Sequence, residues 1–154
     1  MNKINFKRLI ISLAIPLIVG GISSLISMPF MDYGELIQPP LAPPGWLFPI
    51  VWTILYILMG ISFYLILETD NYDKDSSYIA YFVQLIVNGL WSIFFFAFKW
   101  RLFSIFWLLL LIVLIVLMIT KFYKISKISG ILQIPYLLWC LFALYLNIGI
   151  YILN

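Results

Sequence analysis

The sequence predicts an all-α membrane protein in which five transmembrane helices form one bundle. Hydrophobic residues make up 65% of the 154 residues and charged residues only 10%, so polar side chains are too few to cover a soluble protein. Every charged residue lies outside five apolar runs. A helix crosses the hydrocarbon core with about 20 apolar residues, because each residue rises about 1.5 Å. We expect one domain over residues 1–154, with spans at about 9–31, 45–67, 76–98, 102–120 and 128–152.

Helices explain these runs better than the strands of a β-barrel. In hydrocarbon every backbone N–H and C=O must be paired, which only helices and closed barrels achieve. Barrel strands are about 10 residues long and alternate apolar with polar side chains. The stretch 105–119 is apolar throughout and shows no alternation. It therefore indicates a helix.

The first span is expected to remain in the protein as a membrane helix. It is longer than the apolar core of a signal peptide, and no small-residue cleavage site follows it. Small residues recur on its faces at helical spacing, and they favour close packing against a neighbouring helix. These residues are Gly20, Ser23, Ser24 and Ser27.

Residues 32–44, which we call the lid, connect the first two spans. Two proline pairs, at 39–40 and 43–44, exclude a continuous helix, since proline lacks an N–H and restricts the residue before it to extended geometry. The sequence therefore predicts a stiff, extended lid that ends where the second helix begins. Pro49 lies one turn into that helix and predicts a slight kink.

Polar and aromatic residues recur at helical spacing in the second, third and fifth spans. Amides are costly in hydrocarbon unless they find partners, so they are expected to face the bundle interior. Tryptophan rings among such amides suit a planar heteroaromatic ligand. The candidates are Trp52 and Tyr56 in the second span, Gln84, Asn88, Trp91, Ser92 and Phe95 in the third, and Trp139, Ala143 and Asn147 in the fifth.

The same residues have a simpler interpretation that the spacing leaves open. Interior amides often bond between helices without binding a ligand. Tryptophan also gathers at membrane interfaces, and this explains Trp46, Trp100 and Trp107 as anchors.

Lysine and arginine predict the orientation in the cell membrane. The N-terminal segment and the gaps at 68–75 and 121–127 carry seven of these residues, whereas the gap at 99–101 carries two. Cytoplasmic loops hold the excess of positive charge. The N-terminus is thus expected in the cytoplasm and the C-terminus outside. This asymmetry also accounts for the net charge of +3 without a nucleic-acid partner.

Several kinds of chemistry are excluded by composition. Histidine is absent, and Cys140 is the single cysteine, so neither a histidine-based metal or acid–base site nor an intrachain disulfide can form. All six acidic residues lie between the spans, whereas ion-coupled transporters usually carry a carboxylate within one. We expect no metal and no resident cofactor.

Three segments together resemble the family of tryptophan-rich sensory proteins and translocator proteins, TspO. They are residues 39–60 (PPLAPPGWLFPIVWTILYILMG), 84–96 (QLIVNGLWSIFFF) and 135–147 (PYLLWCLFALYLN). The resemblance extends over essentially the whole chain. It implies a five-helix bundle with a pocket that opens toward the loop between the first two helices.

The resemblance also implies ligands and site residues. The family binds porphyrins, so protoporphyrin IX or haem is the expected ligand, and a second copy of the chain is a candidate partner. Pocket residues of the family match Tyr33, Trp52, Tyr56, Asn88, Trp91, Ser92, Trp139 and Ala143. Some bacterial members degrade protoporphyrin IX in light, and the aromatic residues linked to that reaction match Tyr33, Trp52 and Trp139.

The chain departs from the family pattern at four positions. Asp32 stands where the family has tryptophan, Gln38 where it has lysine and Leu41 where it has an aromatic residue; Trp107 aligns near a common acidic residue. The first three alter the lid and the fourth alters the wall of the fourth helix. The sequence leaves three functions open. The leading one is a porphyrin receptor, sensor or carrier. The second is a light-dependent porphyrin-degrading enzyme, and the third is a membrane scaffold without a ligand.

Overall fold

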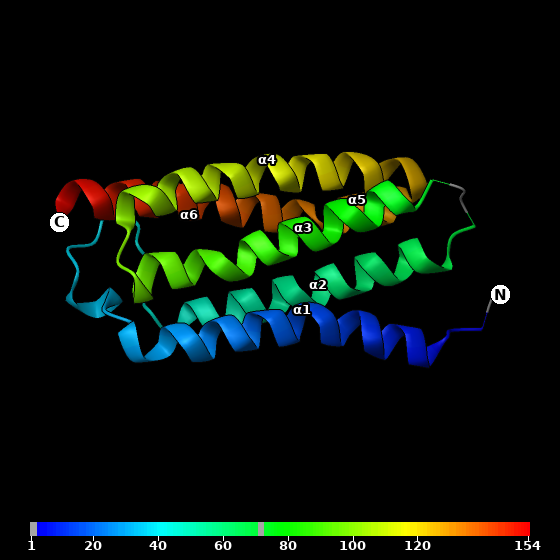
Figure 1. Cartoon of the computed structure of the whole chain (residues 1–154), viewed down its shortest axis with the longest axis horizontal. Coiled ribbons are helices and arrows are strands. Elements are labelled where there is room, and N and C mark those ends of the chain that lie inside the picture. Colours follow the sequence, from blue (N-terminus) through cyan, green and yellow to red (C-terminus); the bar gives the residue numbers. More distant parts are fainter. Residues whose placement is uncertain (1–2, 71–72) are drawn as a thin grey trace.

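The computed structural model describes residues 3–70 and 73–154, and these ranges contain helices and connections but no strand. Five helical segments are long and apolar enough to cross a membrane, which confirms the predicted fold class. They lie side by side in an elongated bundle with the two termini at opposite ends (Figure 1). Residues 71 and 72 of the expected loop 68–75 lie outside the described residues.

The helices follow the expected order, with some spans divided. The first span comprises α1 (Phe6–Ser27) and a 3₁₀ turn, η1 (Met28–Phe30), and the second span is α2 (Leu47–Glu68). The third span comprises α3 (Asp75–Ser92) and a π-helical turn, η3 (Ile93–Ala97). The fourth span is α4 (Arg101–Ile125), and the fifth comprises α5 (Lys127–Leu132) and α6 (Ile134–Leu153). A further 3₁₀ turn, η2 (Tyr33–Glu35), lies in the lid.

The largest difference from the expected spans is at the end of α4. The span 102–120 was expected to end before a loop at 121–127, but α4 continues to Ile125. Lysine stems can lie along an apolar surface while their ammonium groups reach water, so lysines do not end a membrane helix. Only Ser126 separates α4 from α5, and its side chain caps α5 by accepting a hydrogen bond from the Ser129 N–H.

The third and fifth spans are not uniform α-helices. In the fifth, Gln133 separates α5 from α6, because Pro135 cannot donate a backbone hydrogen bond and its ring crowds the preceding turn. In the third, the chain widens into η3 before Lys99, which adopts a positive φ of 55° and turns the chain into α4. π-Helical turns of this kind often lie near functional sites.

The lid is less extended than the prolines predicted. It contains η2 and a turn in which the Ala42 N–H donates to the Pro39 carbonyl, and Leu41 inside that turn has a φ of 67°. Contacts with α6 hold the lid down: Asn154 exchanges two hydrogen bonds with the backbone of Ile37, and the Tyr145 hydroxyl donates to the Pro40 carbonyl. The lid therefore lies at the end of the bundle that holds the C-terminal residue Asn154.

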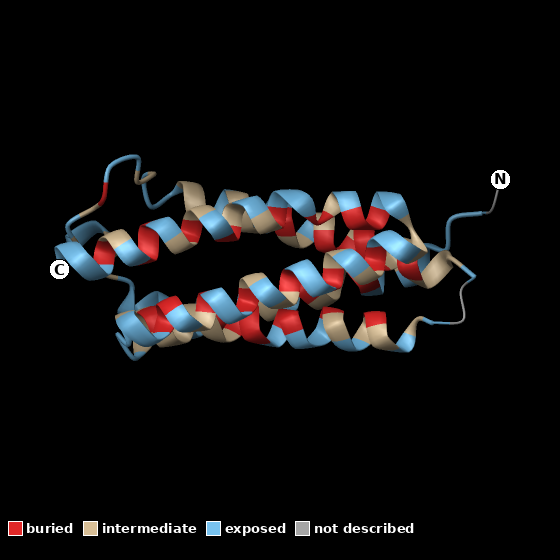
Figure 2. Ribbon diagram, turned by 90° about the horizontal axis from the view of Figure 1, so that it is seen from above, coloured by how far each residue is buried: buried red, intermediate tan, exposed pale blue. Residues whose placement is uncertain are grey.

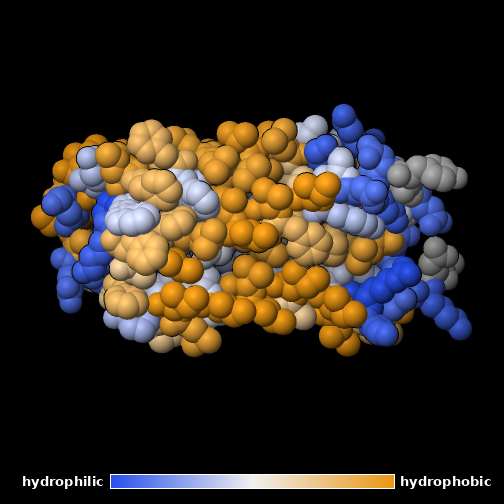
Figure 3. Space-filling model, viewed as in Figure 1, coloured by the Kyte–Doolittle hydropathy of each residue, from blue (hydrophilic) through white to orange (hydrophobic). Residues whose placement is uncertain are grey.

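The helices pack into one core and keep apolar side chains on their outer faces. α1 packs on α2 and α3, α4 packs on α3 and α6, and α5 packs on α2 and α4. Buried and exposed positions follow stripes along the helices (Figure 2). Large apolar residues such as Ile18, Leu110 and Val113 are exposed. The face in Figure 3 is hydrophobic across its middle and hydrophilic toward both ends, as lipid contact requires.

Candidate functional site

A hydrogen-bonded network centred on Asn88 joins three helices inside the bundle. The Asn88 amide oxygen accepts from the Tyr56 hydroxyl at 2.9 Å, and the amide nitrogen donates to the Tyr136 hydroxyl at 2.6 Å. Tyr136 in turn donates to the amide oxygen of Gln84 at 2.8 Å. Gln84, Asn88 and Tyr136 are buried. The network therefore fixes α2, α3 and α6 relative to one another, and the predicted amides Gln84 and Asn88 face the interior.

Trp52 packs on the two tyrosines of this network. Its ring stacks on Tyr56, with 5.5 Å between centroids and 29° between planes, and meets the edge of Tyr136 at 6.3 Å. Trp52 and Tyr56 lie on one face of α2, four residues apart, as the spacing predicted. The network thus orients one aromatic face of the candidate site.

Aromatic contacts connect the lid to α6. Phe48 at the start of α2 meets Tyr33 of the lid at 5.0 Å and Trp139 of α6 at 5.8 Å, both edge to face. The Tyr33 hydroxyl donates to the Pro43 carbonyl at 2.8 Å. Partial burial raises the pKa of Tyr33, so its hydroxyl stays protonated and able to donate at neutral pH.

Buried donors around these rings lack partners within the described ranges 3–70 and 73–154. They are the indole N–H groups of Trp91 and Trp139 and the amide nitrogen of Gln84. A buried donor without a partner costs about 1–3 kcal/mol. A bound molecule with acceptor atoms would remove that cost, so these donors are suited to a ligand.

A hollow of about 430 Å³ opens beside Trp139, between α2 and α6. Its walls are apolar, and it extends along the membrane-spanning part of both helices. The lining residues are Val51, Ile54, Leu55, Leu58, Pro135, Leu138, Trp139 and Phe142. An apolar, flat molecule could reach Trp139 from this side.

The structure brings most of the predicted site residues to one core but separates some from the network. Trp52, Tyr56, Trp91 and Trp139 pack against the buried cluster that contains Ala143. Trp91 stacks on Phe95 at 5.3 Å. The buried Asn147 donates to the carbonyl of Ala143 in its own helix, at 2.8 Å.

Ser92 faces α1. Its hydroxyl lies 2.6 Å from that of Ser23 and 2.9 Å from that of Ser27, and Ser23 also bonds the Gly89 carbonyl. The small residues of the first span thus pack helices as predicted. Ser92 is placed in this helix contact and not among the aromatic rings.

Trp107 is not a membrane-interface anchor, and that interpretation is wrong. Its indole N–H donates to the carbonyl of Val87 in α3 at 2.8 Å, and its ring meets Phe94 edge to face at 4.9 Å. The half-buried ring therefore joins α4 to the third span. Trp46 and Trp100 are largely exposed, as the interface interpretation requires.

Sequence reasoning missed two residues that organise the site, Tyr136 and Phe48. Both left a signal in the helical spacing, since Phe48 lies four residues before Trp52 and Tyr136 three residues before Trp139. Within the described residues, no cluster of three or more histidine, cysteine or acidic side chains could hold a metal ion.

Comparisons with known proteins agree with this architecture. Residues 12–153 match the model of the TspO/MBR family. The chain is 35% identical to the tryptophan-rich protein TspO of Archaeoglobus fulgidus over 152 residues, which cover 97% of this chain and 99% of that protein. It is 39% identical to a protein of the same name from Chlorobaculum tepidum over 79% of this chain and 78% of the relative. A translocator protein homolog of Schizosaccharomyces pombe is 29% identical over 91% and 88% of the two chains.

Proposed function

The chain belongs to the TspO/MBR family of integral membrane proteins, and on this premise we propose that it is a receptor, sensor or carrier that binds porphyrins inside its helix bundle. The observation that carries the proposal is the set of aromatic rings and unpaired donors that α2, α3 and α6 contribute to one core. Trp52, Trp91 and Trp139 supply flat faces, and two of these three indoles have a buried N–H without a partner in the described structure. A porphyrin offers a planar ring for stacking and polar atoms for these donors.

The network of Asn88 supports the proposal by holding the site in advance of binding. Tyr56 and Tyr136 are fixed by hydrogen bonds and in turn contact Trp52. A ring that is held in place loses little conformational entropy when a ligand stacks on it.

Replacing Trp52 or Trp139 with alanine should weaken porphyrin binding at least about fivefold, because aromatic contacts contribute on the order of 1 kcal/mol beyond their buried area. The measurement is a titration of purified protein in detergent with protoporphyrin IX, kept dark so that photobleaching cannot imitate lost binding. Trp46→Ala is the matched control, since Trp46 is 68% exposed at the start of α2. Unchanged affinity in both Trp52→Ala and Trp139→Ala would contradict the proposed site.

We also propose that the N-terminal end of the bundle faces the cytoplasm and the lid faces outward. The five spans alternate in direction, so the seven lysines and arginines of the N-terminal segment and of the 68–75 and 121–127 segments share one end. Arg101 and Lys99 lie at the lid end. The excess of positive charge supports this orientation.

Cysteine labelling in intact cells tests this orientation. On a Cys140→Ser background, a membrane-impermeant thiol reagent should label Leu41→Cys and leave Lys74→Cys unlabelled until the cells are opened. Leu41 is 85% exposed in the lid, and Lys74 lies at the opposite end, next to the end of α2. Labelling of Lys74→Cys alone in intact cells would reverse the proposed orientation.

A further inference from the structure

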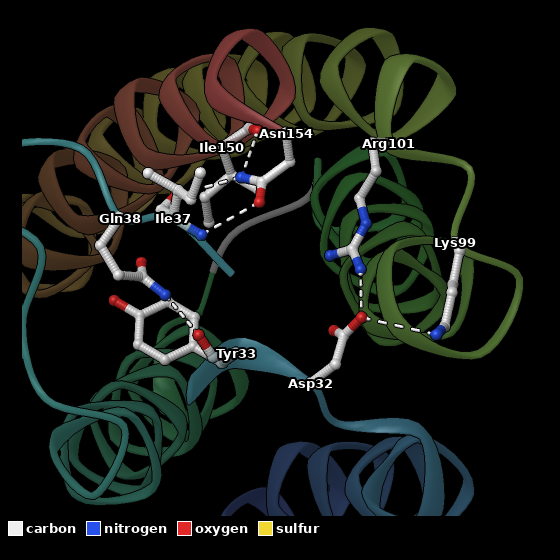
Figure 4. Close-up of polar contacts among 8 residues, drawn as sticks. All are labelled: Asp32, Tyr33, Ile37, Gln38, Lys99, Arg101, Ile150 and Asn154. Carbon is white, nitrogen blue, oxygen red and sulfur yellow. Dashed lines mark hydrogen bonds and ion pairs between the residues drawn. The ribbon is translucent and has the colours of Figure 1, made fainter. Parts of the chain in front are cut away.

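The acidic residue that distinguishes this lid is held by two cations. Arg101 donates from Nη2 to the Asp32 carboxylate oxygen Oδ2 at 2.7 Å, and Lys99 Nζ lies 3.5 Å from the same oxygen (Figure 4). The side chains of Asp32 and Arg101 are each 15% exposed. Asp32 thus ties the lid to the start of α4, across the outer end of the bundle.

In this ion pair, the carboxylate and the guanidinium group each use one terminal atom and leave the other without a bond. Asp32 Oδ1 and Arg101 Nη1 are both buried, and neither has a hydrogen-bond partner in the described part of the chain. A guanidinium group pairs best with a carboxylate that accepts two parallel hydrogen bonds. With two cations against one carboxylate, the cluster also keeps one positive charge. A carboxylate that placed both of its oxygens on the guanidinium group would bond Arg101 more completely than Asp32 does.

Arg101 also adjoins the aromatic wall of the proposed porphyrin site. Its guanidinium carbon lies 4.4 Å from the centroid of the Phe95 ring, and Phe95 stacks on Trp91 with 21° between their planes. A planar ligand packed near Trp91 would therefore lie close to a cation on the lid side. An acidic substituent on that ligand would meet it.

Space is available beside the two cations. A hollow of about 670 Å³ lies between the start of α4 and the end of α6, and Lys99, Arg101 and Asn154 are among its lining residues. Asn154 is the residue that holds Ile37 of the lid. A group that enters here meets both the cations that hold Asp32 and one of the contacts between the lid and α6.

We propose that Arg101 and Lys99 form a subsite for the carboxylate groups of the bound tetrapyrrole, and that Asp32 of the lid occupies this subsite when no ligand is present. The inference rests on the proposed function, because it assigns two residues of this chain to the carboxylate groups of the same ligand. A ligand carboxylate that replaces Asp32 releases the tie between the lid and α4. Binding of an acidic ligand is thereby coupled to release of the lid from α4.

Protoporphyrin IX and its dimethyl ester test the subsite, because the two share one ring and the ester lacks free carboxylates. Arg101→Gln should weaken binding of protoporphyrin IX about tenfold, since charge-assisted hydrogen bonds are roughly twice as strong as neutral ones. The affinity for the dimethyl ester should change by less than about twofold, because the ester has no carboxylate to pair with Arg101. Lys99→Gln should act in the same direction with a smaller effect; Lys99 is 60% exposed, so this variant keeps the fold. Asp32→Ala should tighten binding of the acid alone, because it removes the competing carboxylate.

Arg8→Gln is the matched control, because Arg8 pairs with Glu68 at the opposite end of the bundle. Arg8→Gln should bind protoporphyrin IX and its dimethyl ester with the same affinities as the wild type. If the wild type binds acid and ester equally, or if Arg101→Gln and Lys99→Gln weaken both alike, the subsite is wrong while porphyrin binding stands. If the wild type binds neither porphyrin, the proposed function fails and the subsite fails with it.

Discussion

Gly60→Ala should lower the free energy of unfolding by about 1–3 kcal/mol, although it adds only one methyl group. Gly60 is buried in α2 where α1 crosses it. A Cβ atom there would lie 2.7 Å from the Leu13 Cα and 2.8 Å from the Ser12 carbonyl oxygen. Both are backbone atoms of α1, so no side-chain rotation can relieve the overlap. The two helices would have to move apart.

Gly21→Ala makes the same chemical change without the overlap, since a Cβ at Gly21 has no atom within 4 Å. Alanine favours a helix over glycine by up to about 1 kcal/mol, so this variant should be as stable as the wild type or more stable. Both variants can be unfolded in detergent with increasing SDS and followed by circular dichroism. Equal midpoints for Gly60→Ala and Gly21→Ala would show that α1 and α2 do not pack as closely as the structure places them.

The fold was predictable because one physical constraint dominates the sequence. Charges are excluded from the hydrocarbon core, so their positions mark where each span must end. The helix bounds were less predictable, because lysine stems allow α4 to continue to Ile125. The division of the fifth span at Gln133 follows from Pro135, which the sequence displays, but hydropathy alone treats the run as continuous.

The direction of the site's amides was predictable, but their partners were not. Burial in hydrocarbon forces Gln84 and Asn88 inward, whichever helices surround them. That Asn88 bonds Tyr56 and Tyr136, while Ser92 one turn later bonds α1, depends on the rotation of α3 between its neighbours. A hydropathy pattern shows which face of α3 turns inward, but it does not show which neighbouring helix lies on each side of that face.

The ion pairs of Asp32 could not be predicted from the sequence for a similar reason. The sequence shows an aspartate at position 32 and two cations 67 and 69 residues later. The three groups meet only because Lys99 takes a positive φ that ends the third span, and because the lid folds back over the bundle. Both features are local backbone geometry that composition does not determine.

Asn88→Leu should lower the free energy of unfolding by about 1–3 kcal/mol, because it removes a buried amide that bonds two other helices. A single hydrogen bond between membrane helices contributes about 0.6 kcal/mol on average. The larger effect is expected because Tyr56 loses its acceptor and Tyr136 loses a donor in one substitution. Both rings contact Trp52, so porphyrin affinity should also fall severalfold.

Asn147→Leu provides the matched comparison for stability, since Asn147 is an equally buried asparagine of a membrane helix. Its amide nitrogen bonds only Ala143 of the same helix, and its amide oxygen has no partner among the described residues. Leucine removes an unpaired polar atom there, so the free energy of unfolding should change by less than about 1 kcal/mol. SDS unfolding of the two variants in the same detergent measures the difference. Equal losses would mean that Asn88 contributes no more than a local bond, and that the tyrosines beside Trp52 are held by packing alone.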